Sequence, residues 1–149
     1  MQDNIERKPE ELAYLAGYID ADGSIALVHV KTPNKYRAVL SVTASRRDIL
    51  AELQEIVGIS GTLWTGKNGK NAKREHSQLL YFDRKAFRVL EMVQPYLRLK
   101  GAQAVILIQI GDFRLKHPSG KGFNRNAYYI PRYDEMRALN LGNKSDLIR

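Results

Sequence analysis

The sequence LAYLAGYIDADGSIALVHV, residues 12–30, passes from a helical pattern to a strand pattern within a few positions. Small and apolar residues recur at helical spacing in its first half, and apolar and β-branched residues dominate its second half. The change falls in the acidic segment DADG, residues 20–23. The stretch therefore predicts a helix from Pro9 to about Asp20 that is followed almost directly by a strand from Ser24 to Lys31.

Asp20 and Asp22 stand at the carboxyl end of this helix, where the helix dipole is already negative and an acid is unfavourable. Ala13, Ala16 and Gly17 form a small-residue stripe that would let a second copy of the helix approach closely. Two copies would bring their carboxylates together, and a hard divalent cation is the natural occupant of such a place. The alternatives are that the stripe packs within one protomer and that an Asp before Gly caps a turn. The predicted dimer interface consists of Ala13, Ala16, Gly17 and Asp20.

The rest of the chain alternates between strand and helix signals. Two hairpins separated by a helix can form one four-stranded antiparallel sheet, with helices on one face and the other face open. We therefore predict an α+β fold with an αββαββα core. The further elements expected are strands at 36–43, 61–65 and 77–82, helices at 46–58, 84–97 and 99–115, and a short last helix or turn at 132–142.

Alternation within the strands predicts which side chains lie on the open face. In the second strand, Arg37 and Ser41 alternate with apolar residues, which favours the open face for both. In the first strand, His29 has the same parity as the inward-facing Ile25. We therefore expect a β-bulge or register change near Val28, which would turn His29 to the open face.

The charge of the chain indicates its partner. Its 24 Lys and Arg residues against 16 Asp and Glu residues give a formal net charge of +8. This excess favours nucleic acid before a membrane, because no basic amphipathic helix is evident. Both expected hairpin tips are basic, and a two-stranded ribbon fits the major groove of double-stranded DNA; solvated loops without a ligand are the alternative. The predicted DNA-binding residues are Lys31, Asn34, Lys35, Arg37, Ser41, Lys67, Lys70, Lys73, Arg74 and Ser77.

Length and composition limit the number of domains and the class of protein that the chain can form. The 149 residues are enough for one domain with a single core. No run of 18 apolar residues is present, so no membrane segment is expected. Without cysteine, neither a disulfide nor a thiolate metal site can form. The first residues lack a basic segment followed by an apolar one, so we expect a protein that is not secreted and acts in the cytoplasm or nucleoid, or in an organellar matrix.

The segment LAGYIDADGS, residues 15–24, resembles the signature of the LAGLIDADG homing endonucleases and differs from the nine-letter motif only at Tyr18. The segment QPYLRLKGAQA, residues 94–104, is similar to a family segment that carries a lysine of the catalytic site, which corresponds to Lys100. Within a single domain, the resemblance covers roughly residues 8–117, and we expect a basic loop and a short helix in residues 118–149. A single copy of the motif resembles the homodimeric members of the family, which cut nearly palindromic DNA.

This resemblance implies roles for individual residues. Asp22 corresponds to the metal-binding acid of the family, with the backbone carbonyl of Ala21 as a further ligand. The implied cofactor is Mg²⁺, which Mn²⁺ or Ca²⁺ could replace for binding, since these hard ions prefer oxygen ligands. Lys100 would offset charge on the scissile phosphate or organise the attacking water. Arg46 or Arg47 would supply the basic residue that many such sites have at the start of the second helix.

The implied activity is metal-dependent hydrolysis of DNA that leaves a staggered double-strand break at a long, nearly palindromic site, as in intron or intein homing. The alternative is a protein of the same fold that binds DNA without cutting it, or a maturase whose partner is intron RNA. Ala44 stands where the family commonly has a polar residue, often Gln, that positions water. This departure keeps the alternative open.

Overall fold

The computed structural model describes residues 7–32, 34–67, 74–118 and 125–146. The expected strands and helices up to residue 116 are present, with ends that differ by a few residues. In chain order the elements are α1 (Pro9–Asp22), β1 (Gly23–Val30), β2 (Lys35–Ala44), α2 (Arg47–Val57), β3 (Thr62–Gly66), β4 (His76–Phe82), α3 (Arg84–Val93), the 3-10 turn η1 (Gln94–Tyr96), α4 (Gly101–Lys116) and α5 (Arg125–Asp146).

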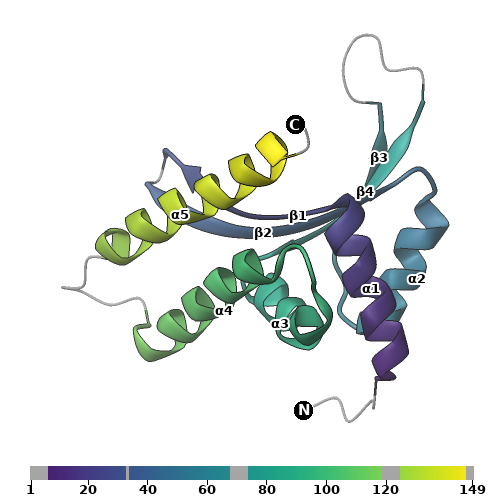
Figure 1. Ribbon diagram of the computed structural model, residues 1–149, viewed down its shortest axis with the longest axis horizontal. Coiled ribbons are helices and arrows are strands. Elements are labelled where there is room, and N and C mark those ends of the chain that lie inside the picture. The colour runs from purple at the N-terminus through teal and green to yellow at the C-terminus, as the bar shows by residue number, and fades with distance from the viewer. Residues whose placement is uncertain (1–6, 33, 68–73, 119–124, 147–149) are drawn as a thin grey trace.

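The four strands form one antiparallel sheet in the order β1-β2-β4-β3. The helices α1 to α4 lie together on one side of this sheet, and the β3–β4 hairpin extends beyond them (Figure 1). The predicted α+β class, with an αββαββα core and helices on one face of the sheet, is confirmed. None of the helices in the described part of the chain is both long enough and apolar enough to cross a membrane.

The core lies between the inner face of the sheet and these helices. Leu40 and Val42 of β2 are buried there against Leu15 and Ile19 of α1 and against apolar residues of the other helices. Burial of each such side chain contributes about 1.5–3 kcal/mol of hydrophobic stabilisation. The alternate residues of β2, including Arg37, point to the other face, as the sequence predicts. This packing holds the end of α1 at the sheet.

The expected bulge in β1 is wrong. β1 pairs with β2 in unbroken register from Gly23 opposite Val42 to Val30 opposite Lys35. His29 therefore stays on the inner face, where its ring stacks on Tyr36 at 4.7 Å between centroids and meets Tyr133 of α5 edge-on at 6.3 Å. A polar residue is accommodated at this inward position because the rings of Tyr36 of β2 and Tyr133 of α5 contact it.

The tail after residue 117 also differs from the expectation. Most of the expected basic loop, residues 119–124, lies outside the described residues. In place of the expected short helix, residues 125–146 form the continuous helix α5, which lies against the end of the sheet formed by β1 and β2 (Figure 1). Tyr129 and Met136 are buried, and Asn140 donates to the backbone carbonyl of Ile25 at 3.1 Å. Pro131 lies inside the helix, where it costs about 3 kcal/mol relative to alanine. Tertiary packing of the buried face outweighs that cost.

Candidate active site and nucleic-acid interface

The end of α1 forms the centre of the candidate site. The helix extends to Asp22, and β1 begins at the next residue. Gly23 makes this direct transition possible, because a Cβ at that position would lie 2.7 Å from the carbonyl oxygen of Ile19. The sharp turn leaves Asp22 exposed at the junction of helix and sheet.

Asp20 has a partner that the local sequence does not reveal. Its carboxylate accepts hydrogen bonds from the backbone N–H groups of Arg98, Leu99 and Lys100, at 2.8, 3.1 and 3.0 Å. These groups immediately precede α4, whose amino end carries the positive end of a helix dipole. An acid at the negative end of α1 is therefore stabilised by the positive end of another helix. The interface role of Asp20 stays a prediction.

Lys100 makes a second contact between the same two segments, this time from its side chain to the backbone of α1. Its Nζ donates to the carbonyl oxygens of Ile19 and Asp20, at 2.9 and 2.8 Å, and so satisfies two acceptors at the end of α1. Burial lowers the pKa of Lys100, and the negative charges of Asp20 and Asp22 oppose that shift. The contacts join segments 80 residues apart in the chain and place the predicted lysine at the same helix end as Asp22.

Replacing Asp20 with alanine tests the strength of this connection. We expect Asp20→Ala to lower the free energy of unfolding by about 1–2 kcal/mol, because three backbone N–H groups lose a charged acceptor but can be partly hydrated. Urea denaturation measures the change. Asp112→Ala, at an exposed position of α4, is the matched control and should change stability little. Equal losses in both variants would contradict the assigned role.

The ligands of a metal ion are incomplete in one protomer. No group of three or more His, Cys, Asp or Glu side chains that could hold a metal occurs among the described residues. The Asp22 carboxylate has no hydrogen-bond or ion-pair partner in that same part of the chain. The Asp22 carboxylate and the backbone carbonyl of Ala21 are oxygen donors of the kind that Mg²⁺ prefers, and the further oxygen ligands would come from water, from a bound phosphate or from a second protomer.

The predicted small-residue stripe divides into two parts. Ala13 and Gly17 are exposed, and a Cβ built on Gly17 would meet no atom of the described residues within 4 Å. Ala16 is 0% exposed and packs in the core of the protomer, so its prediction as an interface residue is wrong. The physical reason is that Ala16 shares the buried face of α1 with Leu15 and Ile19. The open part of the stripe leaves a surface on which another helix could pack.

Arg46 and Arg47 begin α2 but make contacts with other groups. The Arg46 guanidinium pairs with Asp48, and their hydrogen bond raises the pKa of Arg46. Arg47 donates to Thr65 Oγ1 at 3.1 Å. Within the described residues, neither arginine has a hydrogen bond or an ion pair with Asp22. Their catalytic roles stay predictions.

Ser77 is wrongly predicted as a DNA-binding residue. It lies opposite Ala44 in the β2–β4 register, is 2% exposed, and hydrogen-bonds Thr65 at 2.9 Å. Its parity therefore places it on the helix-covered face. The neighbouring Gln78 has the opposite parity and bonds Thr43 at 3.5 Å on the outer face. Gln78 is the polar outer-face residue that the sequence analysis missed, and strict alternation from buried Leu79 could have identified it.

The other predicted DNA-binding residues fall into four groups. Arg37 and Ser41 belong to the outer-face set of β2, and the Arg37 guanidinium lies 3.9 Å above the Phe82 ring. Asn34 is exposed but hydrogen-bonds His29 at the hairpin end. At the two hairpins, four predicted basic residues are exposed: Lys31, Lys35, Lys67 and Arg74. Lys70 and Lys73 lie outside the described residues.

Comparisons with known proteins agree with this arrangement. Residues 9–93 match the model of the LAGLIDADG-like domain. The chain is 29% identical over 129 residues to the intron-encoded DNA endonuclease ai2b of Dictyostelium discoideum, and 33% identical over 108 residues to the DNA endonuclease I-CvuI of Chlorella vulgaris. These alignments cover 87% and 67% of this chain but only 40% and 63% of the relatives' lengths.

Solved structures show the same fold. A crystal structure of the homing endonuclease I-CvuI in complex with its target in 2 mM Ca matches with a TM-score of 0.68 and 28% identity, covering 87% of this chain and 82% of that one. A second I-CvuI complex, with an uncleaved DNA target in 2 mM Mg, matches with a TM-score of 0.70 over the same shares of the two chains. Since the domain match covers more than half of the sequence and the fold agrees, the chain belongs to the family of LAGLIDADG-like domains.

Proposed function

We propose that the chain is a Mg²⁺-dependent DNA endonuclease that acts as a homodimer on a long, nearly palindromic site, as in intron or intein homing. The names of its relatives support this proposal, because both are DNA endonucleases. The main structural support is that Asp22 is exposed at the end of α1, where Lys100 is held by hydrogen bonds to backbone carbonyl oxygens. An acid and a cation in this arrangement suit a site that holds a metal ion beside a phosphate.

The open face of the sheet supports DNA as the substrate. β1 has eight residues and therefore extends about 26 Å, which corresponds to roughly eight base pairs of a duplex. In the proposed complex, outer-face side chains such as Ser41 and Gln78 lie toward base edges in the major groove. Basic residues at the hairpin ends, including Lys67 and Arg74, lie toward the phosphates and add salt-dependent affinity.

The proposed dimer places two α1 helices together through the surface of Ala13 and Gly17. Each protomer then contributes one Asp22 carboxylate and one Lys100 ammonium near the common axis. Each Asp22 would serve a different DNA strand, which accounts for a staggered double-strand break. When bound, the metal supplies an activated water and neutralises charge that develops on the phosphate and the leaving oxygen. Asp22 holds the ion, and Lys100 adds positive charge beside the scissile group.

Cleavage and binding assays test the proposal. The probe is a duplex that joins the sequences flanking the reading frame, because a homing endonuclease cuts the site that its own coding element interrupts. Cleavage in Mg²⁺ together with binding but no cleavage in Ca²⁺ is the expected result. Tight binding without cleavage in either ion would support a DNA-binding protein instead. Binding to the flanking intron RNA with no affinity for the duplex would support a maturase.

Gly17→Leu tests the dimer. A Cβ at this position meets no described atom of the protomer within 4 Å, and leucine is a better helix former than glycine, so we expect a folded monomer. Sedimentation velocity measures the oligomeric state. Glu55→Leu, which adds a leucine to the exposed surface of α2, is the control and should remain dimeric. A dimeric Gly17→Leu variant would mean that the protomers associate through another surface.

A further inference from the structure

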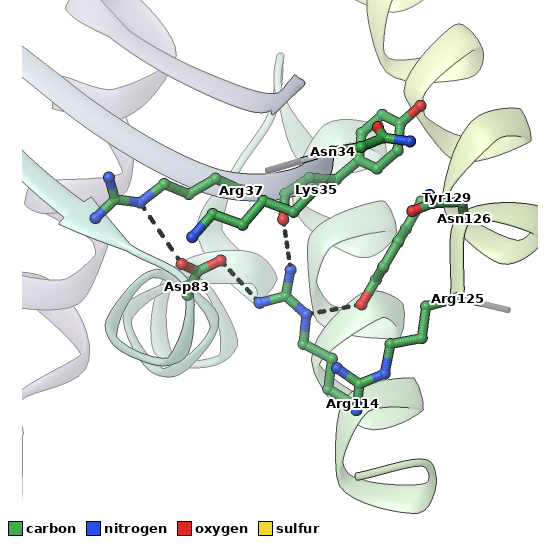
Figure 2. A pocket seen from close by; sticks show the side chains of 9 residues that line it. Asn34, Lys35, Arg37, Asp83, Arg114, Arg125, Asn126 and Tyr129 are labelled. Carbon is green, nitrogen blue, oxygen red and sulfur yellow. Dashed lines mark hydrogen bonds and ion pairs between the residues drawn. The ribbon is translucent and has the colours of Figure 1, made fainter. Parts of the chain in front are cut away.

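A basic cavity lies at the hairpin end of β2, where this strand continues past the end of β4. It has a volume of about 450 Å³ and is formed by residues of β2, α4 and α5 together with Asp83 (Figure 2). Among the described residues that line it, four side chains are cationic, Lys35, Arg37, Arg114 and Arg125, and one, Asp83, is acidic. These described residues therefore carry an excess of three positive charges.

Arg114 forms the rigid wall of this cavity. Its guanidinium donates to Asp83 Oδ1 at 2.7 Å, to the Tyr129 hydroxyl at 2.9 Å, and to the backbone carbonyl of Tyr36 at 3.0 Å. The last contact gives Tyr36 a partner at the point where β2 has no neighbouring β4 residue. Burial tends to lower the pKa of Arg114, but the hydrogen bonds to Asp83 and Tyr129 outweigh it and raise the pKa. Arg114 therefore remains charged.

The remaining cations are poorly neutralised. Arg37 lies 3.7 Å from Asp83, beyond hydrogen-bond distance, and shares that carboxylate with Arg114. Arg125 donates to the backbone carbonyl of His117, which carries no charge. Among the described residues, the Lys35 ammonium has neither a hydrogen bond nor an ion pair. Such an arrangement of convergent donors favours an anion with several acceptor oxygens.

The position of the cavity identifies the source of that anion. Lys35 lies opposite Val30, whereas Val42 lies opposite Gly23 beside Asp22, so the cavity and Asp22 are at opposite ends of the β1–β2 ribbon. Arg37, which lines the cavity, also belongs to the outer face of the sheet. A duplex that lies along this face therefore passes the cavity at the end farthest from Asp22.

We propose that this cavity binds a phosphodiester group of the DNA backbone at the outer end of each half-site. The inference rests on the proposed function, since it takes double-stranded DNA as the ligand. It assigns Lys35, Arg37 and Arg125 to backbone contacts that add affinity without base specificity. Arg114 holds the cavity in shape through Asp83, Tyr129 and Tyr36 and does not need to contact the DNA.

Salt-dependent binding in Ca²⁺ tests this inference. For Lys35→Ala, we expect the slope of log affinity against log salt concentration to fall in magnitude by about 0.9 per protomer, with equal affinity losses for the target and for single-base variants of it. Lys35→Arg should restore the slope. Arg88→Ala removes the same charge from an exposed position on the helical side and should leave the slope unchanged. A loss confined to one base pair, or an unchanged slope for Lys35→Ala, would overturn the inference.

Chemically altered duplexes locate the contact. Neutral methylphosphonate groups are placed one at a time along each half-site, and affinity is measured for the unaltered protein and for Lys35→Ala. We expect that a methylphosphonate at one outer position of the half-site lowers the DNA affinity of the unaltered protein. The same methylphosphonate should not lower the affinity of Lys35→Ala any further. If inorganic phosphate binds in the cavity but no methylphosphonate position shows this effect, the cavity is a site for free anions and the inference is overturned. Absence of cleavage with these binding results intact would count against the proposed function alone.

Discussion

Asp22→Asn is expected to abolish DNA cleavage while DNA affinity stays close to that of the unaltered protein. The substitution keeps the size of the side chain but removes the negative charge that binds the metal ion, which is worth several kcal/mol of transition-state stabilisation. We therefore expect the single-turnover cleavage rate in Mg²⁺ to fall by on the order of 10³-fold or more. Affinity measured in Ca²⁺ should change little, because Asp22 lies at the helix end and not on the outer-face positions of the sheet.

Asp134→Asn is the matched control, because Asp134 is an exposed carboxylate on α5. It should cut at the normal rate. Normal cleavage by Asp22→Asn would show that the site assignment is wrong. Loss of both binding and cleavage would instead mean that Asp22 is needed to assemble the DNA-binding dimer.

Lys100→Met is expected to have the second largest effect. Methionine has a similar length but cannot donate to the carbonyl oxygens of Ile19 and Asp20, and it removes the positive charge beside Asp22. Loss of one preorganised charge-stabilising group typically slows a reaction about 10²–10³-fold. We expect a decrease of this size in the single-turnover rate, with near-normal affinity for the duplex.

The structural role of Lys100 has to be separated from its chemical role. Because its Nζ satisfies acceptors at the end of α1, we also expect Lys100→Met to lower the free energy of unfolding by about 1 kcal/mol. Asp20→Ala weakens the same connection but keeps the ammonium group, so it serves as the comparison. If both variants slow cleavage equally, Lys100 acts by holding the two segments together. A normal rate for Lys100→Met would remove it from the site.

Local patterns are sufficient for the existence of the four strands and for the open face of β2. Alternation in β2 predicts that Leu40 is inside and Arg37 outside, because a strand places successive side chains on opposite faces. Gly58 has the left-handed conformation, with φ of 71°, expected of a glycine at a helix end. The motif around Asp22 likewise depends on neighbours in the chain. Such features are encoded within a few residues, so they can be recognised without the fold.

The errors arise where distant segments decide the environment of a residue. His29 is inward because α5 covers it, and nothing within β1 indicates that helix. Ser77 is buried because its parity is set by pairing with β2, and a shift of one residue exchanges the two faces of a strand. The extent of α5 depends on burial of Tyr129, which compensates for Pro131. In each case the deciding energy comes from tertiary contacts.

The two aspartates of α1 show most clearly the difference between what local sequence predicts and what distant contacts determine. The sequence alone determined that they stand at the negative end of a helix and that a favourable positive partner has to offset them. That Asp20 meets the amino end of α4, while Asp22 stays exposed beside Lys100, follows from the folded arrangement of the helices. The physical reason is that a charge interacts with whatever the fold brings near it, and the partner of Asp20 is 80 residues away in the chain.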